Sequence, residues 1–279
     1  MKQNILLKLS YDGVRYKGWE HQKNETLTIQ GKLELLLYRM LIKEKYGDEV
    51  IKKLQDRLKD ITGSFEEQAL KEIDFKIPTV IGAGRTDAGV SAKEMTANVI
   101  IDTEMSLDEI QDYMNLYLPD DIAVLSIKRV KDNFHSRFMA KAKTYRYCCY
   151  YGRVKPVFDR KYVSCLTKEV DIELMKKAAE SLIGKHDFKS FCGNPHMKKS
   201  TVRTIDSIII EKEGPYIYFT YHGDGFLQNM VRIMTGTLLD IGRGLIDVEE
   251  IKGILEACDR KKAGHTAPPN GLMLINVEY

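Results

Sequence analysis

The sequence lacks the features that mark a membrane protein or a secreted one. Its 279 residues contain no apolar run close to the ~20 residues that span a bilayer. The first residues enter a strand-like pattern with neither an apolar signal region nor a small-residue cleavage site. We therefore expect a cytoplasmic protein with no membrane partner.

Cysteine and histidine are few and scattered. The five cysteines include no Cys-x-x-Cys pair, and the six histidines lie far apart. Disulfide frameworks and local zinc sites need even-numbered or closely spaced sets of these residues. We predict reduced thiols and no metal.

The composition is that of a folded chain, with 43% hydrophobic and 30% charged residues. A chain of this length can bury roughly 75% of the surface that it exposes when unfolded. It is long enough for one elaborate domain or for two tightly joined ones.

Positive charge is concentrated in one segment, although the net charge of the chain is only +3. Residues 128–161 contain eleven Lys or Arg and two acidic residues, whereas the rest of the chain contains 32 basic and 38 acidic residues. Tyr and Phe residues interleave with these cations. Cations beside aromatic rings suit a phosphate backbone that carries exposed bases. The alternative is an ordinary solvated face.

Periodicity predicts a similar order of elements in each half of the chain. In the first half we expect a strand at 5–11, a helix from Ile29, a second helix with Val50, Leu54, Leu58 and Ile61 on one face, a short strand at 80–81 that leads into a glycine-rich turn, a strand at 97–101, a helix from the capping box Ser106/Glu109 and a strand at 123–127. In the second half we expect a strand at 144–151, a helix at 171–182 with Leu174, Ala178 and Leu182 on one face, a hairpin of 205–210 with 217–221, helices at 226–241 and from Asp247, and a closing strand at 273–279.

This order predicts an α+β fold. Each half reads strand, helix, strand, strand, helix, strand, the split β-α-β-β-α-β unit. Two such ferredoxin-like halves would join into one mixed, mainly antiparallel sheet with helices on one side and a cleft between the halves. We place the halves at 1–130, with a helical insertion at about 44–78, and at 131–279.

The most unusual segment is the glycine-rich loop at residues 82–90. Three glycines bracket Arg85, Thr86 and Asp87 between two predicted strands, so the loop presents these side chains. It is no dinucleotide fingerprint, because Asp87 stands where the third glycine would be, and no Gly-Lys-Ser/Thr follows for a P-loop. We expect no nucleotide cofactor. An aspartate that only bonds its own loop amides is the alternative.

Several ordered blocks of the chain resemble one family, the TruA family of tRNA pseudouridine synthases. The loop Gly84-Arg85-Thr86-Asp87-Ala88-Gly89-Val90 is the hallmark of that family. The other blocks span nearly the whole chain and include Tyr11-Asp12-Gly13, Tyr16-Lys17-Gly18-Trp19, Thr28-Ile29-Gln30, Phe134-His135-Ser136-Arg137-Phe138, Tyr145-Arg146-Tyr147, Met230-Val231-Arg232 and Ala267-Pro268-Pro269.

The resemblance implies the pseudouridine synthase fold and an isomerase that converts uridine to pseudouridine in the anticodon stem-loop of tRNA (tRNA positions 38–40) without a cofactor. By the same match, Asp87 is the essential carboxylate, Tyr145 stacks on the uracil and Arg232 is the basic partner of the aspartate. From its strand position alone, Tyr145 reads as an ordinary core residue. Candidates for binding the RNA are Arg85, Thr86, Arg137, Lys141, Lys143 and Arg146. The family also implies a homodimer.

Three features depart from the family pattern. Residues 91–95 read Ser-Ala-Lys-Glu-Met where the family usually has a histidine and then Gly-Gln, and Glu20 stands where it has Gln. The segment 43–78 is also longer than usual. These departures keep open a paralogue that modifies another structured RNA, and an RNA-binding protein without catalysis is the hypothesis from another class.

Overall fold

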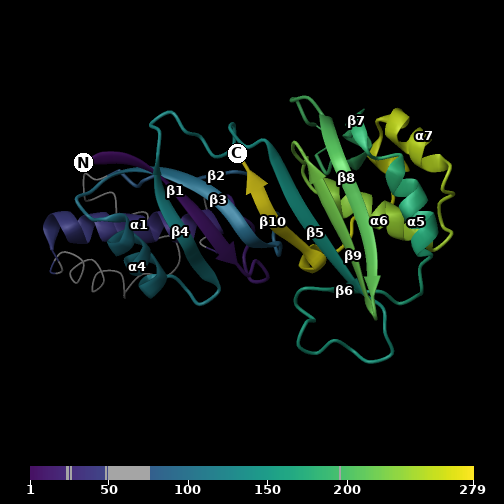
Figure 1. The fold of residues 1–279 in the computed structure, drawn as a ribbon, viewed down its shortest axis with the longest axis horizontal. Helices are drawn as coiled ribbons and strands as arrows, with labels where there is room; N and C mark the ends of the chain where they lie inside the picture. The colour runs from purple at the N-terminus through teal and green to yellow at the C-terminus, as the bar shows by residue number, and fades with distance from the viewer. Residues whose placement is uncertain (23–24, 26, 48, 50–75, 195) are drawn as a thin grey trace. The chain divides into compact units, whose positions relative to one another are not determined.

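The computed structural model describes residues 1–22, 25, 27–47, 49, 76–194 and 196–279. These residues form an α+β fold with five α-helices and a mixed sheet of ten strands (Figure 1). The chain divides into two compact units, one of residues 1–88 and 94–139 and the other of residues 89–93 and 140–279. The division follows Met139, whereas the sequence places it after residue 130. None of the described helices is long and apolar enough to cross a bilayer.

The first unit is a small ferredoxin-like unit. Its elements are β1 (Lys2–Tyr11), α1 (Ile29–Tyr46), β2 (Ile81–Gly82), β3 (Ser91–Asp102), α4 (Leu107–Tyr117) and β4 (Ile122–Val130). The strands are ordered β4-β1-β3, with the two-residue β2 paired to β3. Because α1 contacts α4, both helices lie on one face of these strands.

Local sequence signals set the ends of both helices in the first unit. The Thr28 hydroxyl caps α1 by accepting a hydrogen bond from Gly31 N. The capping box predicted for α4 is confirmed, since Ser106 and Glu109 each bond the other's backbone N–H.

Of two further predictions for the first unit, one is confirmed only in part and one is not tested. The strand expected at 123–127 forms as part of β4, but the residues of β4 that are buried are Ile122 and Val124, while Leu125 is 47% exposed. The predicted helix with Val50, Leu54, Leu58 and Ile61, and with it most of the expected insertion, lies outside the described residues.

The second unit repeats the ferredoxin-like order with additions. Its elements are β5 (Ala142–Tyr150), β6 (Ser164–Cys165), α5 (Ile172–Glu180), β7 (Gly184–Asp187), β8 (Val202–Glu213), β9 (Tyr216–Gly223), α6 (Met230–Gly242), α7 (Glu250–Ala257) and β10 (Leu272–Glu278). The strands are ordered β10-β5-β9-β8-β7, and Ser91 and Ala92 at the start of β3 pair in parallel with β10. Helix α5 packs on α6, so both lie on one face of this part of the sheet (Figure 1).

Three details of the second unit differ from the predictions. Helix α6 begins at Met230 rather than at Phe226, because Asn229 before it has a left-handed backbone (φ 58°) that a helix cannot continue. Strand β7 was not predicted. Leu174 lies on the exposed side of α5, where Met175 and Ala178 form the buried face instead.

Candidate active site

The Asp87 loop connects β2 to β3 and is fixed by backbone contacts in the first unit. Thr86 is buried, with its hydroxyl 2.9 Å from the hydroxyl of Tyr11, and its carbonyl oxygen accepts a hydrogen bond of 3.1 Å from Trp19 N. Trp19 is itself fully buried and lies 6.1 Å from the Tyr11 ring, centroid to centroid. These contacts hold the loop on both sides of Thr86 and leave Asp87 half-buried.

Two glycines allow this close packing. A Cβ atom at Gly18, whose φ is +99°, would lie 2.8 Å from the Thr86 carbonyl oxygen, and a Cβ at Gly82 would lie 2.5 Å from the Trp19 ring. Neither position accepts a side chain without displacing its neighbour. The sequence block around Gly18 and the block around Asp87 therefore pack directly against each other, backbone to backbone.

Arg85 and Arg137 lie close together beside one carboxylate. Arg85 forms an ion pair with Glu20 at the surface. Burial lowers the pKa of Arg137, and the positive charge of Arg85 lowers this pKa further, whereas Glu20 opposes the shift. Three charged groups of the first unit thus share one region, and Glu20, known from the sequence only as a departure, is the anion among them.

The turn that carries Arg137 is anchored by a buried amide network. The Ser136 N–H and hydroxyl both donate to Asn98 Oδ1 at 2.8 Å, and Asn98 Nδ2 donates to Asn4 Oδ1 at 3.0 Å. Next to this anchor, Phe138 is 77% exposed and stacks on His135 with ring centroids 4.2 Å apart. The buried Ser136 thus supports an exposed aromatic residue and a cation.

A hollow of about 750 Å³ lies beside the same turn. The cations Lys128, Arg129 and Lys131 line it together with the apolar side chains of Phe134 and Met139. The part of the basic segment that belongs to the first unit therefore forms a concave surface with positive charge, as a phosphate backbone requires.

In the second unit, Tyr145 lies at the middle of strand β5. It pairs with Leu274 of β10 and Tyr221 of β9, and only 7% of its surface is exposed. Its ring meets the Phe226 ring edge to face, with centroids 5.1 Å apart. Sequence reasoning missed Phe226 as a neighbour of Tyr145, because it gave that residue to the following helix.

The other basic residues of this strand have distinct positions. Arg146 lies on the opposite face of β5 from Tyr145 and stacks over the Tyr218 ring at 5.7 Å. An RNA contact made by Arg146 is therefore separate from one made at Tyr145. Lys141 is exposed just before the strand, and Lys143 is partly exposed within it.

An exposed loop of the second unit, residues 151–163, follows β5. Phe158 at this loop is 93% exposed, and four cations surround it in sequence: Arg153, Lys155, Arg160 and Lys161. The single acid of the loop, Asp159, accepts a hydrogen bond of 2.6 Å from the Tyr216 hydroxyl. An exposed aromatic ring among cations suits a stacking contact with a base.

Arg232 lies on helix α6 and is held at two of its nitrogens. Its Nε donates to the Ala267 carbonyl oxygen and its Nη1 donates to Asn229 Oδ1, both at 2.8 Å. The left-handed backbone of Asn229, which ends the preceding turn, places this acceptor beside the helix. The sequence marked Arg232 and the block that begins at Ala267, but it gave no signal that the two are in contact and none for Asn229.

Comparisons with known proteins agree with these features. A family model described as tRNA pseudouridine synthase matches residues 178–279. A tRNA pseudouridine synthase A of Clostridium kluyveri is 39% identical over 277 residues, which cover 99% of this chain and 100% of that protein. One of Thermoanaerobacter sp. strain X514 is 38% identical with the same coverage, and a tRNA pseudouridine synthase A 2 of Bacillus cereus is 36% identical over 99% of both chains. The chain belongs to the TruA family of tRNA pseudouridine synthases. The resemblance stated from the sequence is confirmed.

The departure from the TruA pattern at residues 91–95 lies in strand β3. Ser91, Ala92 and Met95 are buried, and Glu94 forms an ion pair of 2.6 Å with Lys8. This departure therefore lies mostly among buried residues of the strand that follows the Asp87 loop. The departure at Glu20 is of another kind, because it changes the charge beside Arg85.

Proposed function

We propose that this protein isomerises uridine to pseudouridine in the anticodon stem-loop of tRNA (tRNA positions 38–40), with Asp87 as its catalytic carboxylate. As a TruA-family enzyme, it is an isomerase that acts on tRNA. The observation that carries the proposal for Asp87 is the interlocked loop around Thr86, which fixes a half-buried carboxylate at one position on the protein.

The reaction needs a carboxylate and no redox chemistry. The N1–C1′ glycosidic bond breaks, the same ring is reattached through C5, and the C5 proton is lost while N1 gains one. Cleavage leaves positive charge at C1′, and a carboxylate beside that atom stabilises the charge or bonds to it, as in glycosidases. It can also act as the base. We assign this work to Asp87.

In this proposal Tyr145 and Arg232 complete the catalytic set, and the other site residues bind the RNA. Tyr145 stacks on the uracil, and Arg232 is the basic partner of Asp87. Arg85, whose loop Thr86 fixes, and Arg137 hold the backbone of the flipped-out nucleotide. Lys141, Lys143 and Arg146 contact phosphates farther along the RNA.

The assembly and location are part of the same proposal. We propose a homodimer in which tRNA is held across both subunits, and a cytoplasmic location. Sedimentation at working concentration tests the first statement: a dimer supports it, and a monomer contradicts it.

Mapping pseudouridine in an unmodified tRNA transcript tests the function. After incubation with the protein, carbodiimide modification and primer extension should place pseudouridine within the anticodon stem-loop. Pseudouridine elsewhere in tRNA, or only in another structured RNA, would instead identify a divergent paralogue. RNA binding without any pseudouridine would indicate the non-catalytic RNA-binding protein.

A further inference from the structure

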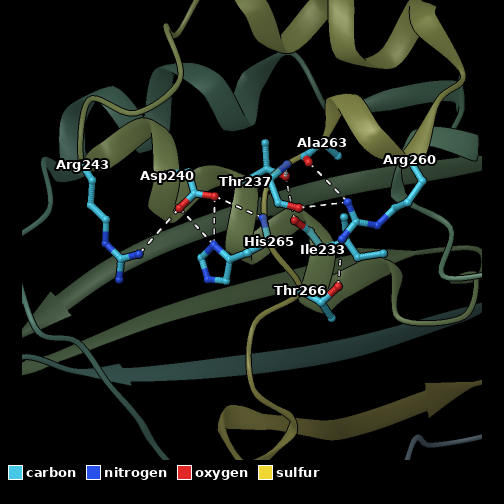
Figure 2. Close-up of polar contacts among 9 residues, drawn as sticks. Ile233, Thr237, Asp240, Arg243, Arg260, Ala263, His265 and Thr266 are labelled. Atoms are coloured by element: carbon cyan, nitrogen blue, oxygen red, sulfur yellow. Dashed lines mark hydrogen bonds and ion pairs between the residues drawn. The ribbon is translucent and has the colours of Figure 1, made fainter.

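The segment between α7 and β10, residues 259–271, crosses helix α6 and touches three residues that bear on the site. We call it the strap. Figure 2 shows the polar contacts of the strap with Thr237 and Asp240 of α6, which in turn contact Ile233 and Arg243. The TruA-like block that begins at Ala267 lies in this strap, and the function proposed above gives it no role.

One face of α6 forms the seat of the strap. Arg232, Gly236 and Asp240 are spaced four residues apart, so they lie on one face of the helix. A Cβ atom at Gly236 would lie 1.9 Å from the His265 carbonyl oxygen. Only glycine therefore allows the strap to cross α6 at this level.

An Asp–His pair holds the strap at the end of this seat. Asp240 Oδ1 and Oδ2 lie 3.0 and 2.9 Å from His265 Nδ1, and Asp240 Oδ2 also accepts a hydrogen bond of 3.2 Å from His265 N. Arg243 Nη1 lies 3.6 Å from the same carboxylate. Asp240 is mostly buried, while the His265 side chain is 41% exposed. The His265 ring therefore holds the strap through its polar contact with Asp240 more than through core packing.

Two further contacts fix the strap beside this pair. Gly264 N donates to the Thr237 hydroxyl at 2.9 Å, and that hydroxyl donates to the Ile233 carbonyl oxygen. Arg260 closes the strap on itself by donating to the Gly264 carbonyl oxygen at 3.0 Å and to the Thr266 hydroxyl at 2.9 Å. The path from Arg260 to Ala267 therefore has little freedom.

The end of the strap provides two backbone carbonyl oxygens that accept hydrogen bonds from residues of α6 and β5. The Ala267 carbonyl oxygen accepts from Arg232 Nε, and Ala267 N donates to the Arg232 carbonyl oxygen at 3.0 Å. The next carbonyl, that of Pro268, accepts a hydrogen bond of 2.8 Å from the Tyr147 hydroxyl. Pro269 packs on Gly89, which follows Asp87 by two residues. One short segment thus contacts α6, β5 and Gly89, all within the second unit.

We propose that Asp240 and His265 are positioning residues for Arg232. By fixing the strap on α6, they set the place of the Ala267 carbonyl oxygen, and that oxygen together with Asn229 sets the plane of the rigid Arg232 guanidinium. This proposal rests on the proposed function, because it assigns Arg232 to the reaction.

The test compares two His–Asp pairs of the second unit. His265→Ala removes the side-chain contact with Asp240, and His265→Gln keeps a side-chain donor for Asp240. The matched control is His222→Ala, since His222 Nδ1 lies 2.8 Å from Asp206 on the sheet and away from the strap. For each variant we would measure hydrogen exchange of residues 263–268, the affinity for a tRNA transcript and the single-turnover release of tritium from C5 of uridine.

We expect His265→Ala to remain folded, to exchange faster at residues 263–268 and to bind tRNA with unchanged affinity. Its single-turnover rate should fall by about tenfold to a hundredfold, the loss caused by a misplaced group. His265→Gln should recover most of the rate, and His222→Ala should leave it unchanged.

Other outcomes separate the two claims. Faster exchange in His265→Ala at an unchanged rate would overturn the positioning role, as would unchanged exchange, because the pair would then not hold the strap. A rate loss of equal size in His222→Ala would overturn it as well. A wild-type protein that releases no tritium from any RNA would overturn the proposed function, whereas an active wild type with an unaffected His265→Ala variant overturns only the strap inference.

Discussion

The two units of the molecule fix their proposed site residues in different ways. In the first unit, Asp87 lies on a loop without regular structure, and the loop is fixed by backbone contact with the Gly18–Trp19 turn. In the second unit, Tyr145 and Arg232 lie on a central strand and a helix, where the regular structure places them. The comparison teaches that a loop can hold a reactive group firmly where glycines let two backbones meet. Tyr145 and Arg232, in contrast, are placed by ordinary sheet and helix geometry.

The largest effect should come from Asp87→Asn. The substitution keeps the shape of the side chain but removes the negative charge that the reaction requires at C1′. We expect pseudouridine formation to fall to background, as read by mapping on a tRNA transcript. A variant that still modifies tRNA near the wild-type rate would show that Asp87 is not the catalytic carboxylate. The loop of the first unit would then not carry the reactive group.

The second prediction tests the loop's support. Gly18→Ala should destabilise the fold by about 1–3 kcal/mol, because it strains a left-handed backbone, and should also slow the reaction by pushing Thr86 away. Thermal unfolding and single-turnover rates measure the two effects.

Gly244→Ala is the matched control for Gly18→Ala. Gly244 also has a positive φ, of +70°, but a Cβ atom there would meet nothing within 4 Å. It should lose about 1–2 kcal/mol of stability from the left-handed backbone alone and keep its rate. Equal rates in both variants would show that the contact with Thr86 does not position the loop.

The third prediction concerns binding by the second unit. Replacing Lys141 and Lys143 by Ala should flatten the dependence of tRNA affinity on salt, by about 0.7 to 0.9 log units per lost phosphate contact for each log unit of salt. Filter binding over a series of salt concentrations gives the slope. If the slope stays at the wild-type value, the RNA lies elsewhere on the surface.

The smallest effect should come from Glu20→Gln. Glu20 pairs with Arg85 at the surface, and such a pair is worth about 0.2–1 kcal/mol. Removing the carboxylate leaves Arg85 to the RNA phosphate, so tRNA affinity should rise by about two- to fivefold. Weaker binding by this variant would mean that Glu20 supports the RNA site instead of competing for Arg85.

The sequence predicted most of the fold because its signals were local. The capping box at Ser106, the alternation in β1 and the turn between β8 and β9 each depend on residues that are neighbours in the chain. Where the structure differs, a local pattern was misleading: the run from Phe226 was predicted as helix from its first residue, but the left-handed backbone of Asn229 delays the start of α6 to Met230.

The support of the site could not be predicted in the same way. The contact of Gly18 with Thr86 and that of Arg232 with Ala267 join residues far apart in the chain. The sequence identified these residues through the family pattern, but the physical reason for each appears only when the backbone is placed. The pair of Asp240 and His265 had no signal of its own, since a lone histidine and a lone aspartate form no motif.

The most direct test of the comparison is the affinity of Asp87→Asn for tRNA. The account assigns the charge of Asp87 to chemistry and the grip on RNA to other residues, so the variant should bind an unmodified tRNA transcript as tightly as the wild type does at the same salt concentration. A clear loss of affinity in a folded Asp87→Asn protein would contradict it, because the carboxylate would then contribute to binding rather than to the reaction alone.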